Sequence, residues 1–409
     1  MNFDLTEEQQ MLQDSAARYV QRSYPFELRR ARANDEGGFR RETWQAIAEM
    51  GWLGVAVPEQ YGGLGFSPVE TGLVAEQLGR ALVLEPFVAC GVFPAALLVR
   101  AGEGGEGGEG GQRAALLEEL ISGQALFAVA HSERQARGTL ASVKTRATNS
   151  GDGWRIDGHK TLVVGAPVAD RLLVVARTAG ADQDPQGLTL FLVDPRGPGV
   201  GVVPTRLLDG TPAADIVFDG ACLDGSAVVG TVGGALSVLQ AAVDEAIVAF
   251  NAELVGGMED TIALCADYLK TRKQFGVAIG SFQALQHRMA DMAIELSQAR
   301  ATLHRGWAAL TQGGAAQGVT VSGCKAQLIR SARFVTTQGI QLHGGYGITD
   351  EYKVGHHYRR LLMLDAQFGN MEFHLKRYAC HIQDEARAAM SGRCADTAAK
   401  NLSLTLAKD

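Results

Sequence analysis

The chain has 409 residues, of which 46% are hydrophobic and 20% charged, a composition typical of a globular protein with two or three domains. The formal net charge of -7 argues against a general nucleic-acid or anionic-membrane binder. The six cysteines form no CxxC pair, no apolar run reaches membrane-spanning length, and the polar N-terminus does not resemble a signal peptide. We therefore expect a cytoplasmic protein with reduced thiols, no metal site and no membrane attachment.

Residues 1–123 are expected to form an N-terminal helical domain. Thr6 followed by Gln9 is the pattern of a capping box, in which each side chain bonds the other residue's backbone N–H at a helix start. Apolar residues then recur at the spacing of a buried helix face. The same spacing predicts further helices over 41–51, 68–82 and 113–124. The glycine-rich segment 101–113 is predicted to be a flexible surface connection.

Residues 124–230 are expected to form a middle β domain. Short apolar or alternating runs follow one another here, separated by Gly, Pro, Asp and Asn at the intervals of turns. This pattern predicts a small antiparallel β-barrel or sandwich.

Residues 231–390 return to helical patterns and are expected to form a four-helix bundle. A very long helix starts near Gly234, two long amphipathic segments follow, and a last helix is predicted over 368–390. The tail, 391–409, is expected to be loosely structured. The fold class is thus α+β and multidomain, with a helical, a β and a second helical domain in chain order.

The segment "KTRKQFG", 270–276, places unusual residues at the end of the long helix. Arg272 offers a rigid fork for phosphate oxygens, Phe275 could cover a flat ring, and Gly276 lets the chain turn. The alternative from local spacing is a plain helix end, with cations favourable to the helix dipole.

The segment "QLHGGYG", 341–347, is the second candidate site. Its glycines would allow close approach of a ligand to the backbone, and Gln341 can donate or accept hydrogen bonds. A glycine-rich helix end is the alternative, and His343 is as readily a packed helix-end histidine as a ligand. No strand precedes either glycine cluster, so neither is a Walker or Rossmann loop.

These segments resemble motifs of the acyl-CoA dehydrogenases. "YLKTRKQFGVAIGSFQALQHRMADM" (268–292) is similar to the family's C-terminal signature, "IQLHGGYGITDEY" (340–352) to its second glycine motif, and "PEQYGGLGF" (58–66) to a loop of its N-terminal domain. The resemblance spans about 1–388 and includes the domain order.

The resemblance implies FAD bound at a subunit interface. Arg272 is expected to hold the flavin pyrophosphate, and Ser132 of the β domain is expected to contact the cofactor. The other expected cofactor residues are Gln274, Phe275 and Gln283 beside the motif arginine, and Gln341, His343, Gly344 and Gly345 supplied by a neighbouring chain. The implied assembly is a homo- or heterotetramer.

The reaction implied is α,β-desaturation of an acyl-CoA thioester. A carboxylate removes the α-proton while the β-hydrogen leaves as hydride to the flavin, and hydrogen bonds to the thioester carbonyl stabilise the developing enolate. The implied electron acceptor is an electron-transferring flavoprotein, and the sequence does not reveal the acyl group.

The expected catalytic carboxylate is missing from both family positions. Asn370 stands at one and Ala246 at the other, and an amide cannot abstract a proton. Glu245 is a weak candidate. It lies one residue before Ala246, and one residue along a helix corresponds to a rotation of about 100° about the helix axis. The catalytic base is therefore unknown from the sequence.

The β domain also departs from the family pattern. Ser132 and Glu133 stand where a threonine and a glutamate are expected, and Leu162 and Val164 replace the tryptophan and threonine that pack on the flavin. These replacements reduce the polar contacts to the flavin ring.

Three functions remain open. The chain is an active FAD-dependent dehydrogenase, or a catalytically silent, FAD-holding subunit of a heteromeric (α2β2) enzyme whose second acyl-CoA dehydrogenase subunit supplies the base, or a flavin-free scaffold. The departures resemble the small-subunit branch that acts on pimeloyl-CoA or steroid side-chain thioesters, in lipid or steroid catabolism. Retention of Arg272 and "QLHGG" weighs against the scaffold.

Overall fold

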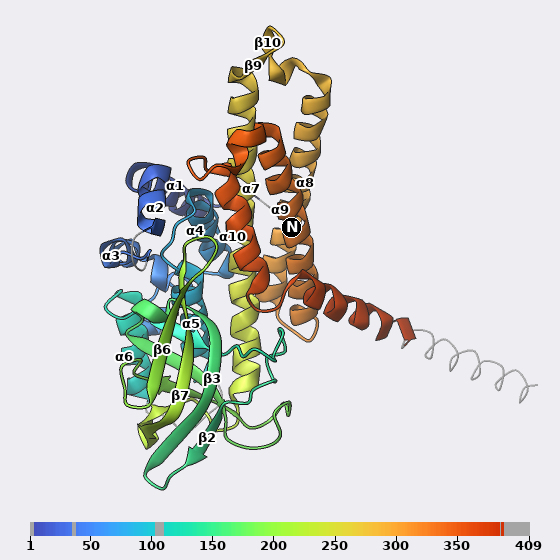
Figure 1. Ribbon diagram of the computed structural model, residues 1–409. Helices are drawn as coiled ribbons and strands as arrows, with labels where there is room; N and C mark the ends of the chain where they lie inside the picture. The colour runs from blue at the N-terminus through green and yellow to red at the C-terminus, as the bar shows by residue number, and fades with distance from the viewer. Residues whose placement is uncertain (1–3, 35–37, 103–109, 385, 388–409) are drawn as a thin grey trace, which may run out of the picture.

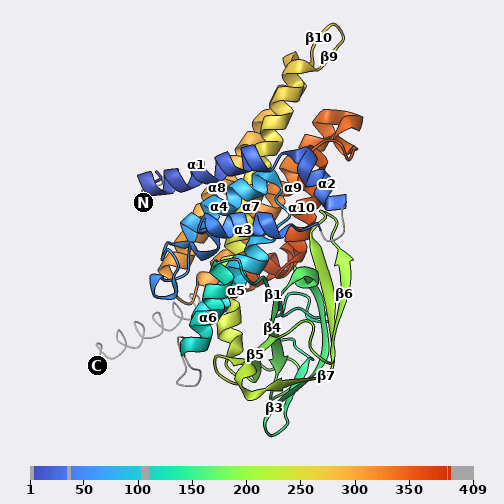
Figure 2. The ribbon, with the colours of Figure 1, turned by 90° about the vertical axis from the view of Figure 1, so that its left-hand side faces the viewer.

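The computed structural model describes residues 4–34, 38–102, 110–384 and 386–387. Most of the predicted glycine-rich connection and the whole predicted tail lie outside these residues. Figures 1 and 2 show a tall helical column with a β domain at its lower end and the N-terminal helices against its side.

The N-terminal helices follow the predicted periodicity. The capping box is confirmed, since the Thr6 hydroxyl accepts a bond from the Gln9 N–H at 3.2 Å and the Gln9 side chain accepts one from the Thr6 N–H at 3.0 Å. A second capping box, Ser67 with Glu70, starts another helix. The elements are α1 (Glu7–Ser23), α2 (Phe26–Asn34), α3 (Arg41–Glu49), η1 (Trp52–Gly54), η2 (Glu59–Tyr61), α4 (Pro68–Ala81), the π-helix η3 (Phe87–Val92), α5 (Phe93–Arg100) and α6 (Gly110–Ile121).

The middle of the chain forms one eight-stranded sheet with the order β6-β7-β3-β2-β4-β5-β8, and β1 pairs with β4. Most neighbours are antiparallel, as predicted, but β4 pairs in parallel with β1 and β2, which makes the sheet mixed. The strands are β1 (Phe127–Ala130), β2 (Arg146–Asn149), β3 (Gly153–Val164), β4 (Arg171–Arg177), β5 (Leu188–Val193), β6 (Val200–Arg206), β7 (Pro212–Asp224) and β8 (Val228–Val229).

The C-terminal helices form the column. They are α7 (Ala235–Thr271), α8 (Gln283–Gln312), α9 (Gln317–His343), α10 (Val354–Ala366) and a last helix over 371–384. The sequence did not predict α10. It predicted a last helix over 368–390, and it assigned no element to the residues that form α10. η7 (Gly344–Ile348) connects α9 to the segment that leads into α10.

The long helix α7 is the centre of the molecule. It packs against α4 of the N-terminal domain and against α8 and α9, so it is apolar nearly all round. By length and composition it is the one described helix that could cross a membrane, and 67% of its most apolar stretch is buried inside the protein. The expectation that no apolar run reaches that length is wrong for α7, where packing on several sides requires apolar residues on every face.

A buried charge cluster joins the three domains. Arg360 of α10 pairs with Asp209 of the β domain at 2.7 Å and with Glu253 of α7 at 3.3 Å. Arg29 of α2 donates to the Asp209 carbonyl oxygen and lies 2.8 Å from a ring nitrogen of His356. The Arg360–Asp209 pair and the Arg29 contacts cross between domains, so the cluster helps to fix the domains relative to one another.

α7 and α8 project beyond the other helices and end in a small hairpin at the top of Figure 1. The hairpin pairs β9 (Lys273–Gln274) with β10 (Val277–Ala278). We call this end of the molecule, residues 268–283 with η7, the bundle tip. The β domain lies at the opposite end of the column (Figures 1 and 2).

Candidate functional site

A groove of about 1070 Å³ lies between the β domain and the start of the last helix. Its walls are residues 131–140, the middle of β3, the end of β6 and residues 366–376. A smaller apolar pocket of about 140 Å³ adjoins it, and we call this the inner pocket. Both spaces are lined by His131, Ser132, Leu162, Ala366 and Phe368. The groove has the size of a cofactor or substrate pocket.

The loop between α10 and the last helix is held from behind by two buried side chains. Lys325 of α9 donates to the carbonyl oxygens of Gln367 and Gly369, the latter at 2.7 Å. A ring nitrogen of His374 lies 3.0 Å from the Phe368 carbonyl oxygen. Phe368 takes a φ of 58°, which is rare for a bulky residue, and these bonds fix it there.

Phe368 closes one end of the groove as part of an aromatic wall. Its ring stacks on His131 with centroids 5.4 Å apart and contacts Phe93 at 5.0 Å and Phe250 at 5.7 Å. Asn370 lines the groove too, but its side-chain oxygen accepts a bond from the Phe373 N–H at 3.0 Å and so caps the last helix. The residue that the fold directs toward the inner pocket is therefore Phe368, two positions before the expected Asn370.

The carboxylates among the described groove residues are Glu133, Asp215 and Glu372. Glu133 is buried and pairs with the buried Lys160 at 2.7 Å. Burial raises the pKa of Glu133, but Lys160 and the hydrogen bonds outweigh burial and lower this pKa to about 2. Asp215 accepts a bond from the Leu162 N–H at 3.0 Å, and Glu372 is exposed. None of the three lines the inner pocket.

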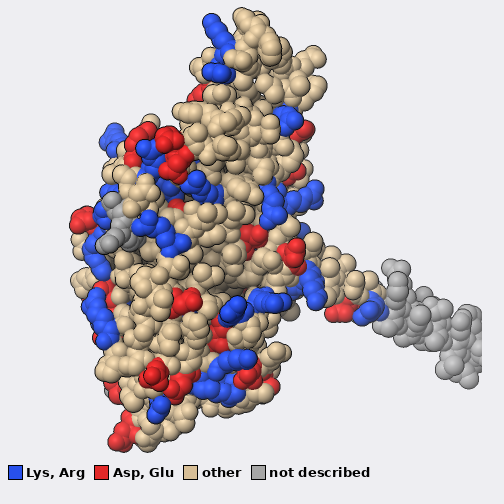
Figure 3. Space-filling view, in the orientation of Figure 1, with Lys and Arg blue, Asp and Glu red and all other residues tan. Residues whose placement is uncertain are grey.

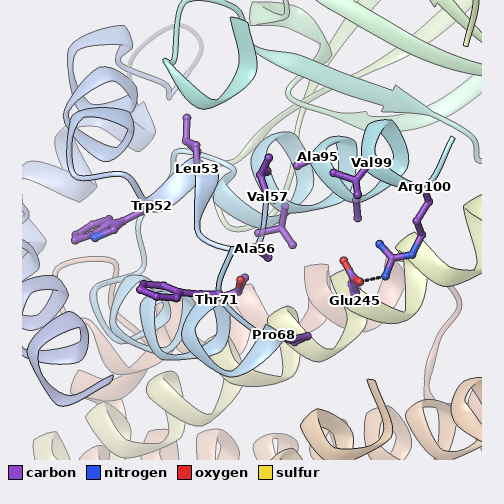
Figure 4. A pocket seen from close by; sticks show the side chains of 13 residues that line it. Trp52, Leu53, Ala56, Val57, Pro68, Thr71, Ala95, Val99, Arg100 and Glu245 are labelled. Atoms are coloured by element: carbon purple, nitrogen blue, oxygen red, sulfur yellow. Dashed lines mark hydrogen bonds and ion pairs between the residues drawn. The ribbon is translucent and has the colours of Figure 1, made fainter. Parts of the chain in front are cut away.

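Glu245 lies outside the groove. Its carboxylate pairs with Arg100 of α5 and lines a separate pocket between the N-terminal helices and α7 (Figure 4). Its neighbour Ala246 is fully buried in the core. The rotation between adjacent helix positions thus carries Glu245 away from the groove, and the structure gives no support to it as the base.

His131 is a groove residue that the sequence did not select. Burial, and then the nearby Lys160 charge, lower the pKa of its imidazole to about 4, so the ring is neutral at physiological pH. Its Nδ1 atom is buried and has no hydrogen-bond partner among the described residues. The only sequence signal was its position directly before Ser132, at the end of the first β-strand.

The predicted cofactor residues around Arg272 lie at the bundle tip. Arg272 ends α7 with an extended backbone, is exposed, and forms no ion pair within the described part of the chain. Phe275 has a φ of 53° and is 92% exposed. Gln274 and Gln283 are exposed as well, the second at the start of α8.

The "QLHGG" residues end α9. Gln341 is exposed, and His343 is buried with its ring nitrogens 2.7 Å from the Gly339 carbonyl oxygen and 3.0 Å from the Tyr352 hydroxyl. Gly344 has a φ of 59°, which favours glycine. A Cβ atom built on Gly344 or Gly345 would meet nothing within 4 Å. His343 is thus a packed helix-end histidine, while the two glycines leave open backbone at the surface.

Both motifs lie at the same end of one chain. The Tyr268 ring is 4.5 Å from the His343 ring, and the Arg272 N–H bonds the Tyr268 carbonyl oxygen at 2.8 Å. The two motifs lie side by side within one chain because α7 and α9 run parallel and both end at the bundle tip. Which chain's motifs contact a given flavin stays a prediction. Ser132 lies in the groove, with the start of the last helix, and not at the bundle tip.

Exposed apolar side chains gather at the bundle tip, beside the exposed cations Lys270, Arg272 and Lys273. Figure 3 shows Lys or Arg side chains at the very top of the molecule and mostly uncharged surface next to them. Exposed apolar patches of this kind mark contact surfaces with other molecules. The large apolar residues exposed here are Phe275, Val277, Phe282, Tyr346 and Ile348, with exposures of 92%, 45%, 38%, 49% and 72%.

The arrangement of the three domains defines the class of protein, and the chain belongs to the acyl-CoA dehydrogenase family. Its sequence matches the family's N-terminal domain over 6–124, its middle domain over 128–221 and its C-terminal domain over 232–383. The family comprises flavin-dependent oxidoreductases that act on CH–CH bonds of acyl-CoA, with FAD as the cofactor.

Among curated proteins, mitochondrial isovaleryl-CoA dehydrogenase of Pongo abelii is 28% identical over 90% of this chain and 87% of its own length. Among solved structures, the ChsE4-ChsE5 complex from Mycobacterium tuberculosis aligns with a TM-score of 0.82 and 26% identity, covering 94% of this chain and 99% of that chain. A variant of the Tcur3481-Tcur3483 steroid acyl-CoA dehydrogenase gives a TM-score of 0.81 and 27% identity, covering 93% and 99%.

The described residues suit FAD at its nucleotide end. The guanidinium of Arg272 is exposed for a pyrophosphate, and Gly344 and Gly345 expose backbone that a ligand can approach. The groove is large enough to hold a flavin ring. The fit is poorer at the ring end, where Leu162 and Val164 present apolar side chains to the inner pocket.

Proposed function

We propose that this chain is the FAD-holding, base-free subunit of a heteromeric acyl-CoA dehydrogenase, which desaturates an acyl-CoA thioester at its α,β-bond. The observation that carries this proposal is the wall of the inner pocket. Phe368 stands there, Asn370 serves as a helix cap, and none of the three groove carboxylates lines the inner pocket. A partner chain must then supply the group that removes the α-proton.

The geometry of one chain supports a flavin shared between chains. The groove borders the start of the last helix, which leaves the column near its middle, well away from the bundle tip (Figure 1). We therefore infer that a cofactor held at the tip does not enter the groove of the same chain. The apolar tip, with Phe275 almost fully exposed, is suited to dock against another subunit. We assign to Arg272 the pyrophosphate, to Phe275, Gln274 and Gln283 the sides of the cofactor, and to Gln341, Gly344 and Gly345 its backbone contacts.

The chemistry divides between cofactor and chain. FAD, when bound, supplies the acceptor for the substrate's hydride. The chain contributes the phosphate-binding fork, the apolar walls that exclude water, and the neutral His131 and Ser132 at the groove. His343, being bonded inside the helix end, acts by fixing the glycine turn rather than by direct contact.

Two solved neighbours support a second, different subunit. The names ChsE4-ChsE5 and Tcur3481-Tcur3483 each denote two components, and the two structures are 26% and 27% identical to this chain. We propose an α2β2 tetramer with a second acyl-CoA dehydrogenase subunit, located in the cytoplasm. We further propose that an electron-transferring flavoprotein reoxidises the flavin.

The test is to purify the chain alone and together with the product of a neighbouring dehydrogenase gene. We expect flavin absorbance and acyl-CoA-dependent dye reduction from the pair, with at least one FAD per heterodimer, and no turnover from the chain alone. Turnover by the chain alone would refute the base-free assignment. If the pair that carries Arg272→Ala keeps its flavin and its full activity, the flavin-binding role of Arg272 is refuted.

A further inference from the structure

The turn η7 carries one aromatic ring at the surface of the bundle tip. Tyr346 lies in the middle of η7, and its side chain is 49% exposed. Its hydroxyl group makes no hydrogen bond within the described part of the chain. The flavin-binding residues assigned above do not include Tyr346, and the packing of the helices leaves about half of its side chain uncovered.

Other aromatic side chains hold the Tyr346 ring from one side. The Tyr352 ring lies 4.4 Å from it between centroids, and the Tyr268 ring of α7 lies 6.3 Å away at an interplanar angle of 22°. Nδ1 of His343 lies 2.7 Å from the Gly339 carbonyl oxygen, and Nε2 lies 3.0 Å from the Tyr352 hydroxyl. Because only a protonated Nδ1 can bond a carbonyl oxygen, Nε2 of the neutral ring accepts the Tyr352 O–H. The buried histidine thus fixes the ring that supports Tyr346.

The backbone around Tyr346 forms a tight turn with open space on one side. A Cβ atom on Gly347 would approach the Ile340 carbonyl oxygen to 2.6 Å, so the turn requires glycine there. On the other side, a Cβ atom on Gly344 or Gly345 would meet nothing within 4 Å. The ring is therefore held in place by the protein itself, next to space that a ligand can enter.

Positive charges stand near this ring. Tyr268 lies one helical turn before Arg272, whose N–H bonds the Tyr268 carbonyl oxygen at 2.8 Å. Lys270 and Lys273 flank Arg272, and all three cations are exposed. An aromatic face beside exposed cations is the combination that binds nucleotides, because bases stack on rings while phosphates pair with cations.

We propose that Tyr346 is the stacking platform for the adenine ring of FAD. Adenine covers the exposed half of the tyrosine ring, while the pyrophosphate reaches Arg272. The bundle tip then selects FAD over FMN, which has the same flavin ring but no adenine. This inference rests on the proposed flavin-binding role of Arg272 and adds to it a residue that determines which flavin is bound.

The test uses the assembled enzyme, this chain with the product of the neighbouring dehydrogenase gene, after removal of its flavin. Titrations with FAD and FMN, followed by flavin fluorescence, give a dissociation constant for each. We expect Tyr346→Leu to weaken FAD binding about tenfold and to leave FMN binding unchanged, because FMN has no base to stack. Tyr346→Phe should bind FAD as the natural assembly does, since it keeps the ring.

ADP tests the bundle tip without a flavin ring. Calorimetry should show that ADP binds the flavin-free assembly and that Tyr346→Leu weakens this binding about tenfold. Tyr61→Leu, which removes an aromatic ring from the N-terminal domain, is the matched control and should bind ADP like the natural assembly.

The stacking role is overturned if Tyr346→Leu keeps the natural ratio of FAD to FMN affinity, or if it weakens FMN as much as FAD. A lower mass of the Tyr346→Leu assembly in light scattering would also overturn it, because the ring would then be a contact between chains. If Arg272→Ala loses FAD while Tyr346→Leu binds it normally, the proposed function stands and only the stacking role is rejected. If the natural assembly binds no FAD, both fall.

Discussion

At the scale of single residues, the structure distinguishes side chains that are exposed and available for a ligand from side chains whose hydrogen bonds are made within the protein. Arg272 and Phe275 are exposed at a surface where nothing of the described chain covers them. Glu133, Asn370 and His343 have their hydrogen bonds satisfied within the protein. Residue type alone does not distinguish these two groups, because an arginine or a glutamate can belong to either.

Replacement of Arg272 by Ala should lower FAD retention at least tenfold, because the guanidinium provides two parallel bonds to a phosphate. The thermal midpoint of the flavin-free chain should change little, since the side chain is exposed. Arg272→Lys keeps the positive charge but loses the two parallel donors, so its FAD retention should lie between that of the natural chain and that of Arg272→Ala. Flavin absorbance per chain after gel filtration measures the effect, and equal occupancy in Arg272→Ala would contradict the assignment.

At the scale of elements, the loop before the last helix shows how a bundle holds a groove in shape. Three consecutive carbonyl oxygens, from Gln367 to Gly369, face Lys325 or His374. Burial lowers the pKa of Lys325 to about 7. The loop thus depends on a lysine that the protein interior resists charging.

The pH dependence of stability should report this lysine. Its folded-state pKa lies below the ordinary value of 10.5, so below about pH 7 the full cost of burying the charge is present. As pH rises from about 7 toward 10.5, the folded state binds fewer protons than the unfolded state, and the free energy of unfolding increases. Lys325→Met should remove this increase. Urea unfolding between pH 7 and 9 measures how the unfolding free energy changes with pH in the natural chain and in Lys325→Met. The same change with pH in both proteins would disprove the prediction.

The charge cluster around Arg360 is the element-scale contact that joins domains. Arg360→Met leaves Glu253 and Asp209 buried without their shared partner, which should cost about 3–5 kcal/mol of unfolding free energy. Arg155→Met, which removes an exposed pair with Asp157, is the matched control and should leave the unfolding free energy nearly unchanged, because solvent screens that pair. Equal losses in the two variants, measured by denaturant unfolding, would show that burial of the cluster does not matter.

At the scale of the whole molecule, the elongated column carries its uncovered apolar end far from the groove. If the tip binds the nucleotide, as we propose, this separation places it away from the groove of the same chain. Assembly would then decide which tip faces which groove.

Charging the bundle tip should break the assembly. Phe275→Asp places a carboxylate on a side chain position that is 92% exposed in one chain and, by our proposal, buried between chains. We expect light scattering coupled to gel filtration to show a smaller species and flavin loss, while circular dichroism stays unchanged. Met11→Asp, at another exposed apolar position of 70% exposure, is the control. An unchanged mass for Phe275→Asp would exclude the tip from the interface.

The sequence by itself determined the features that depend on near neighbours in the chain. The capping box at Thr6, the length of α7 and the alternation from helices to strands follow from spacing of apolar and turn residues, and the two motifs identified the family before any geometry was known. The prediction missed α10, whose short apolar pattern is surrounded by polar and charged residues that pair with distant segments.

Tertiary structure alone decided what depends on contacts between distant segments. Packing of α7 beside α9 brought the two motifs side by side, a one-residue rotation turned Glu245 toward Arg100, and the clamped loop directed Phe368 to the inner pocket. Spacing along the chain fixes the direction of a side chain relative to its own helix. Which neighbour that direction meets is set by how the helices pack, and a sequence pattern does not contain that information.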